Sequence, residues 1–272
     1  MHRSFRRGAG VEFSGHRPYV PGDDLRFLDR RSLMRHDHLM VRQFETDTDR
    51  GLWLLLDASA SMAFRGGAAP AAKLAYASLL AAALGRVAVS GQDAVAAGWI
   101  SAEPLALMPP AFGRPGFERL VDRLEAVTAV GSIHEQLRAV SDAVRGIGRR
   151  VGRGSIVVVF SDLLDLPPGA AGEIAAMGGR GRALVVVQVL DPCERDLDFR
   201  GKVRLRAIEG SAEVVTAAAA VRALYQQRLE AQRSEWRQHL VRVGGRLLTV
   251  TSSDDPVRAL REILVTVAQV RR

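Results

Sequence analysis

The chain has few of the features that mark secreted or membrane proteins. Its 272 residues include one cysteine, Cys193, which can neither close an intrachain disulfide nor form a cysteine zinc site alone. The opening stretch MHRSFRRGAG lacks the apolar core of a secretory signal. The richest apolar stretch, LAYASLLAAAL at 74–84, is too short to cross a bilayer. These absences predict a cytoplasmic protein without a membrane segment.

Aromatic residues are also scarce, at 6%, although the chain carries a net charge of +8. The arginines are scattered along the sequence, and no basic platform interleaved with aromatic residues is present. The six histidines show no spacing that would bring three or four zinc ligands together. Dedicated nucleic-acid binding is therefore not expected, whereas an acidic protein partner suits the charge.

Apolar segments alternate with helix-length segments after about residue 50, which predicts an α/β fold. The predicted strands are 52–56, 93–100, 155–160, 183–190 and 246–251. The predicted helices are 70–88, with Pro70 in its first turn, 115–127, 134–149, 170–178, 217–241 and 256–270, the last capped by Asp255. Strands that are apolar throughout are typical of a parallel sheet covered on both faces. Residues 50–272 are therefore expected to form a doubly wound, mainly parallel α/β domain.

Two segments differ from this alternation. Residues 1–49 are rich in charged and turn-forming residues and contain one short strand candidate, 39–44, so we expect an arm that packs on the main domain. Residues 201–216 resemble a β-hairpin that turns at Glu209-Gly210.

Polar side chains follow two of the predicted strands. Asp57 ends the first strand, and the sequence DASAS places Ser59 and Ser61 directly behind it, while Asp162 follows the strand at 155–160. Ligands of open α/β sheets bind at the carboxyl ends of the strands, where these side chains would meet. Carboxylate and hydroxyl oxygens suit Mg²⁺ or Mn²⁺. The sequence thus predicts a divalent-metal site at this edge.

The pattern Asp57-x-Ser59-x-Ser61 resembles the metal-ion-dependent adhesion site of von Willebrand factor A domains. That resemblance implies that a threonine from a second loop and the later aspartate, here Asp162, complete the site, and that an acidic residue of a bound partner fills the last position. Where that family has Gly-Gly-Thr-Asp, this chain has Val-Gly-Ser-Ile at 130–133. Ser132 is accordingly the candidate, and Thr128 is the alternative.

The N-terminal arm extends the resemblance. It resembles a bacterial branch of the von Willebrand A-type proteins, the domain of unknown function (DUF) fifty-eight family. Two features depart from that family. It usually has tryptophan where this chain has Arg30, and many members carry upstream membrane helices that this sequence does not show. The matching positions are Glu12-Phe13, Arg17, Tyr19, Pro21-Gly22-Asp23-Asp24, Arg26, Asp29 and Val41-Arg42-x-Phe44-Glu45. The resemblance implies a non-enzymatic adaptor or co-chaperone of a MoxR-type AAA+ ATPase. A partner-recognition face is expected among Asp23, Asp24, Arg26, Asp29 and Arg42; the alternative is that these charges pin the arm to the domain.

Two other interpretations of the strand-end residues stay open. Asp57, Ser59 and Ser61 are also the residue types that cap helices and form turns. A metal-dependent hydrolase acting in the same cleft is the enzymatic alternative. A phosphatase of the haloacid dehalogenase type would need a second aspartate where this chain has Ser59, which cannot shuttle a proton in that way.

Overall fold

The computed structural model describes residues 11–19, 39–46, 50–101, 106–133, 137–199, 201–206, 208 and 213–271. The chain divides into two units, Met1–Thr48 and Asp49–Arg272. In the first unit, β1 (Val11–Pro18) pairs antiparallel with β2 (Met40–Thr46), and Arg42 lies opposite His16. The sequence predicted β2 but not β1, whose register shifts between Phe13 and Gly15. Asp23, Asp24, Arg26 and Asp29 lie outside the described residues.

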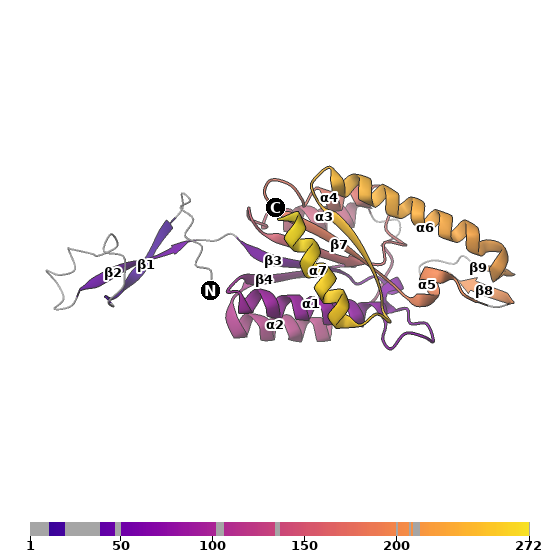
Figure 1. The fold of residues 1–272 in the computed structure, drawn as a ribbon, viewed down its shortest axis with the longest axis horizontal. Coiled ribbons are helices and arrows are strands. Elements are labelled where there is room, and N and C mark those ends of the chain that lie inside the picture. The colour runs from indigo at the N-terminus through magenta and orange to yellow at the C-terminus, as the bar shows by residue number, and fades with distance from the viewer. Residues whose placement is uncertain are drawn as a thin grey trace. The chain divides into compact units, whose positions relative to one another are not determined.

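The second unit is built around a six-stranded sheet in the order β10-β7-β6-β3-β4-β5 (Figure 1). Its strands are β3 (Gly51–Asp57), β4 (Ala94–Ile100), β5 (Ala106–Ala111), β6 (Ile156–Ser161), β7 (Ala183–Leu190) and β10 (Arg246–Thr251). All neighbouring strands are parallel except β4 and β5, which are antiparallel. The five strands that the sequence predicted in this unit are therefore present and parallel.

The edge strand β5 was not predicted, because its sequence ALMPPA contains Pro109 and Pro110. Proline cannot donate a backbone hydrogen bond, so within sheets it is confined to edges and bulges. β5 satisfies this rule, since it pairs on one side only and its pairing with β4 shifts register between Val95 and Ala97.

Helices cover both faces of the sheet, which explains why the strands are apolar throughout (Figure 1). One face packs on α1 (Lys73–Ser90), α2 (Gly113–Ala126) and α7 (Pro256–Val270), and the other on α3 (Leu137–Gly148), α4 (Ala170–Ala175) and α6 (Ala218–Val241). Along β3, Leu54 and Leu56 belong to the first core and Trp53 and Leu55 to the second. The predicted doubly wound α/β class is confirmed.

Helix α1 differs from its prediction in two ways. It begins at Lys73 with Ala72 as its N-cap, so Pro70 precedes the helix and does not occupy its first turn. It also extends to Ser90, and among the described helices it alone is long and apolar enough to cross a membrane by length and composition. Half of that 18-residue window is buried inside the protein, with Leu80 and Ala81 fully enclosed in the core.

The start of α7 is as predicted, because the Asp255 carboxylate accepts hydrogen bonds from Val257 N at 2.7 Å and Arg258 N at 3.4 Å, and Pro256 occupies the first turn.

We expect Asp255→Ala to lower the free energy of unfolding by about 1 kcal/mol, the usual cost of losing an N-cap. Urea denaturation measures this change, and Asp255→Asn, which can still cap, should stay close to wild type. Equal losses in both variants would contradict the capping role.

Residues 192–217 contribute three small elements beside α6. The short helix α5 (Pro192–Asp196) follows β7, and β8 (Lys202–Arg206) pairs antiparallel with β9 (Glu213–Ala217). The predicted hairpin is therefore present, while its predicted turn at Glu209-Gly210 lies outside the described residues. Helix α5 was not predicted, because five residues are too few to show a helical period.

Candidate functional site

The carboxyl ends of β3 and β6 bring the predicted acidic residues to one edge of the sheet. Asp57 is the last residue of β3, Asp162 directly follows β6, and these two strands are paired neighbours. Both residues are nearly inaccessible, with 3% and 1% exposure. Two carboxylates buried in this way repel each other unless a proton or a cation compensates for their charge.

The Asp57 carboxylate is held by serine hydroxyls on both of its oxygens. Oδ1 accepts from Ser59 N at 2.9 Å and from Ser59 Oγ at 2.6 Å, and Oδ2 accepts from Ser161 Oγ at 2.6 Å. Ser59 Oγ also lies 3.1 Å from Ser61 Oγ, and because the Ser59 proton goes to Asp57, Ser61 must be the donor in that pair. Asp57, Ser59 and Ser61 thus form one cluster of hard oxygen atoms, in which Ser61 lies in the short 3₁₀ helix η3 (Ala60–Ala63).

The loop that carries Ser132 is tied to the same segment. Val130 N donates to Ala58 O and Ala60 N donates to Gly131 O, both at 2.9 Å. Ser132 directly follows this pair of hydrogen bonds and is partly buried, whereas Thr128 is exposed. Its place next to Gly131 and its partial burial favour Ser132 over Thr128 as the residue of this loop nearest to Asp57.

Asp162 has a cationic partner that the sequence did not reveal. Lys73, the first residue of α1, donates from Nζ to Asp162 Oδ2 at 2.6 Å and to Glu194 Oε1 at 2.7 Å. The lysine side chain is 0% exposed, and the Glu194 side chain is 15% exposed. Asp162 Oδ1 accepts from Leu164 N at 3.0 Å, so both of its oxygens have donors.

Glu194 is fixed by α5 as well as by Lys73. Its second oxygen accepts from Asp191 N at 3.0 Å, and Asp191 in turn caps α5 by accepting from Cys193 N at 2.9 Å, which completes a capping box. Asp191 also accepts from Gly66 N at 2.7 Å. The Lys73 ion pair therefore joins the ends of β6 and β7 to the start of α1.

Burial and the nearby charges shift the proton affinities of this cluster. Burial, together with the charge of Asp162, raises the pKa of Asp57 from 3.8 to about 6. Burial also raises the pKa of Glu194, and the opposing effect of Lys73 does not cancel it. Burial alone would lower the pKa of Lys73, but Asp162 and Glu194 raise it, so the ammonium stays charged.

The donor chemistry of this cluster suits a hard divalent cation. The carboxylates of Asp57 and Asp162 and the hydroxyls of Ser59 and Ser61 would be the ligands, and Ser132 lies on the adjoining loop. Among the described residues, no group of three or more His, Cys, Asp or Glu side chains is arranged to hold a metal ion. Binding would consequently depend on the serine oxygens.

Sequence reasoning missed Lys73, Glu194 and Ser161. Lys73 is separated along the chain from Asp162 by 89 positions and from Glu194 by 121, and no local sequence pattern predicts such contacts. One compositional signal was available. The chain contains only two lysines, Lys73 and Lys202, among its 38 lysine and arginine residues. The use of lysine at position 73 is therefore unusual for this sequence.

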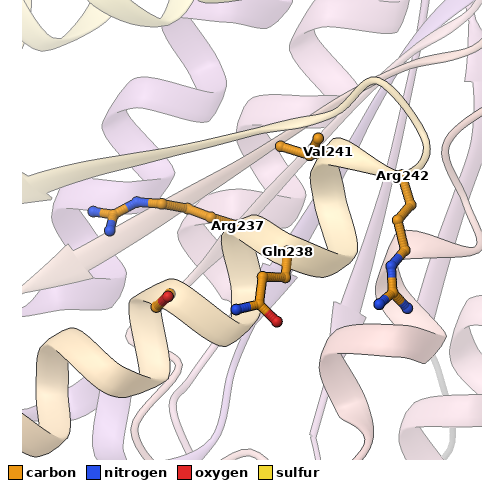
Figure 2. Close-up of a pocket in the computed structure, with 5 residues that line it drawn as sticks. Arg237, Gln238, Val241 and Arg242 are labelled. Carbon is orange, nitrogen blue, oxygen red and sulfur yellow. The ribbon is translucent and has the colours of Figure 1, made fainter.

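A shallow hollow lies on the surface at the C-terminal end of α6 (Figure 2). Its lining residues are Ser234, Arg237, Gln238, Val241 and Arg242. Arg237 Nη1 is paired with Glu230, and α6 leads through Gly244 and Gly245 into the start of β10. The hollow is therefore at the amino ends of the strands, the opposite edge from Asp57.

Comparisons with known proteins agree with this architecture. The chain is 30% identical over 209 residues to uncharacterized proteins of Mycobacterium tuberculosis and Mycobacterium bovis, a match that covers 76% of this chain and 64% of those proteins. The match thus spans less than two thirds of the length of these relatives. Among solved structures, the conserved hypothetical protein BatB from Bacteroides thetaiotaomicron has a TM-score of 0.52 at 16% identity, covering 81% of this chain and 98% of BatB.

A von Willebrand factor type A protein from Catenulispora acidiphila is also similar, with a TM-score of 0.47 at 8% identity, over 85% of this chain and 44% of that protein. The sheet order and the likeness to BatB give this chain the von Willebrand A-like fold that its sequence predicted. The sequence profile of the protein of unknown function DUF58 matches residues 15–235. The chain therefore belongs to the DUF58 family, as the motifs of its arm and its first strand predicted.

Proposed function

We propose that this protein is a non-enzymatic, cytoplasmic binding module whose strand-end site holds Mg²⁺ or Mn²⁺ and uses the ion to engage an acidic residue of a protein partner. The ligands in this proposal are Asp57, Ser59, Ser61, Ser132 and Asp162. The partner is a MoxR-type AAA+ ATPase or a client of that ATPase, as the family resemblance implies.

The excess of buried negative charge at the site supports this proposal most strongly. Within the described cluster, Asp162 and Glu194 share the ammonium of Lys73, while the buried Asp57 carboxylate accepts hydrogen bonds from Ser59 and Ser161. Burying an ionised carboxylate costs several kcal/mol unless a partner compensates for its charge. A divalent cation beside Asp57 would offset much of the remaining negative charge and would explain why a folded protein keeps such an arrangement.

The same burial sets a condition on how the site works. Asp57, Ser59, Ser61 and Asp162 are each at most 3% exposed, so an ion with its own water shell cannot reach them in this closed arrangement. The proposal therefore includes a local opening at this edge of the sheet, where two backbone hydrogen bonds join Ala58 and Ala60 to Val130 and Gly131.

Thermal unfolding with and without metal tests the proposal. A ligand that binds only the folded state stabilises it by RT ln(1 + [L]/Kd), about 2.7 kcal/mol when the ion is at 100 times its Kd. We expect millimolar Mg²⁺ or Mn²⁺ to raise the Tm of the wild type and to leave that of Asp57→Ala unchanged. An unchanged wild-type Tm, together with no heat of binding by calorimetry, would refute metal binding.

The hydrolase alternative requires a reactive carboxylate or an activated water at the same cleft. The residue two positions after Asp57 is a serine where an acid–base carboxylate would be needed. A phosphatase screen in Mg²⁺ and Mn²⁺ is expected to show no turnover. Turnover that disappears in Asp57→Asn would replace the binding-module proposal with the enzymatic one.

A further inference from the structure

We propose that the Lys73 ammonium is the resident cation of this site: it holds Asp162 and Glu194 in the metal-free protein and opposes the binding of a divalent ion. This inference rests on the proposed metal-binding function and adds the residue that sets its affinity. Lys73 is not one of the metal ligands that the sequence predicted.

The geometry of Lys73 is that of an ion in a binding site. Its Nζ lies 2.6 Å from Asp162 and 2.7 Å from Glu194, and it lies 5.9 Å from the centre of the Phe64 ring, which adds a cation–π contact. The lysine is completely enclosed, at 0% exposure, although lysine is among the residue types least often fully buried. Such burial requires that the ammonium be paired on several sides.

The choice of lysine supports the same conclusion. Of the 38 basic residues, only Lys73 and Lys202 are lysines, so this sequence otherwise uses arginine almost throughout. An ammonium is a compact point charge with three donors, whereas a guanidinium is planar and presents a fixed fork. Lys202 is exposed on β8, while Lys73 occupies the one described position where a compact cation is enclosed by carboxylates.

The position of Lys73 leads to a direct electrostatic consequence. Asp162 is both a predicted metal ligand and the partner of Lys73, so a divalent ion must share that carboxylate with the ammonium or displace it. Two cations held within one buried cluster repel each other strongly, because the effective dielectric constant there is far below that of water. Lys73 thus competes with a divalent ion for Asp162 and weakens its binding.

The test is a calorimetric titration of MgCl₂ and MnCl₂ into the full chain and three variants. Lys73→Met keeps the length of the side chain and removes its charge, and we expect it to bind the ion about tenfold more tightly or better, which corresponds to about 1.4 kcal/mol. Glu194→Gln leaves Lys73 with Asp162 alone, so the ion should bind less tightly than to wild type. The double variant Lys73→Met/Glu194→Gln avoids an unpaired Glu194 and should also bind more tightly than wild type, even if Lys73→Met alone does not fold.

The opposite signs of the two single variants distinguish this mechanism from a merely structural ion pair. If Lys73 only stabilised the fold, both variants would bind the ion as wild type does or less tightly, and that result would overturn the inference while leaving the proposed function in place. The absence of binding heat in wild type and in both Lys73→Met variants would overturn the proposed function together with the inference. Binding that is detectable only in the Lys73→Met variants would support the opposing role of Lys73 but would refute metal binding by the wild-type protein, and with it the proposed function.

Discussion

Asp57→Asn is expected to make the metal-free protein more stable at pH 7, by roughly 3 kcal/mol, because it removes a buried charge. The wild-type carboxylate has a pKa of about 6 in the folded state against 3.8 ordinarily. A raised carboxyl pKa means that the folded state holds the proton more tightly than the unfolded chain does. The stabilising contribution of this group is therefore complete below pH 3.8 and is lost as the pH rises through about 6.

Urea denaturation in chelator at pH 5 and pH 7 measures this effect. The advantage of Asp57→Asn over wild type should grow by about 1 kcal/mol between those two values. The raised pKa of Glu194 adds pH dependence to both proteins and cancels in the difference. Asp122→Asn, on the exposed face of α2, is the matched control and should stay within about 0.5 kcal/mol of wild type. A loss of stability in Asp57→Asn at pH 7 would show that its hydrogen bonds outweigh its charge.

Chelation is expected to abolish binding of the protein partner. A metal ion that joins Asp57 to a partner carboxylate forms a desolvated charge contact, and truncating one side of such a contact costs about 2–5 kcal/mol, roughly 30-fold to several thousand-fold in Kd. A tagged full-length chain should therefore recover the MoxR-type ATPase in Mg²⁺, and should lose it with EDTA and in Asp57→Ala.

Surface charge should influence the same complex in a different way. Arg228→Ala, at an exposed position of α6, is expected to alter the association rate and its salt dependence while leaving capture in Mg²⁺ intact. Equal recovery of the ATPase with and without EDTA would contradict the metal bridge. Residues 12–45, which include the predicted face with Arg42, would then become the better candidate for the interface.

The sequence predicted those parts of the structure that depend on local patterns. Apolar strands at regular intervals gave the parallel sheet, and DASAS placed Asp57 and its serines at a strand end. Asp255 and Pro256 marked the start of α7, where the cap is local. By contrast, Pro70 was misplaced, because a proline favours the first turn of a helix but also occurs in the loop before it.

The missing parts of the site depend on the folded chain. In the sequence, Lys73 cannot be distinguished from an ordinary helix residue. It contacts Asp162 and Glu194 because the fold brings the ends of β6 and β7 beside the start of α1. Ser161 likewise donates a hydrogen bond to Asp57 only because β3 pairs with β6. Long-range ion pairs and hydrogen bonds of this kind follow from topology, which a single sequence does not show.

The central position of β3 also affects how the protein is made. β3 is the first strand of the six-stranded sheet along the chain. One of its two neighbours is β6, and Ile156 of β6, which pairs with Leu52, is synthesised more than 100 residues later. At about 5–20 residues per second, a ribosome needs roughly 5–20 s to produce that partner. During this interval the apolar segment GLWLLL has an open hydrogen-bonding edge that other nascent chains can pair with. Losses by aggregation would therefore arise during translation, before the stability of the finished sheet can protect the strand.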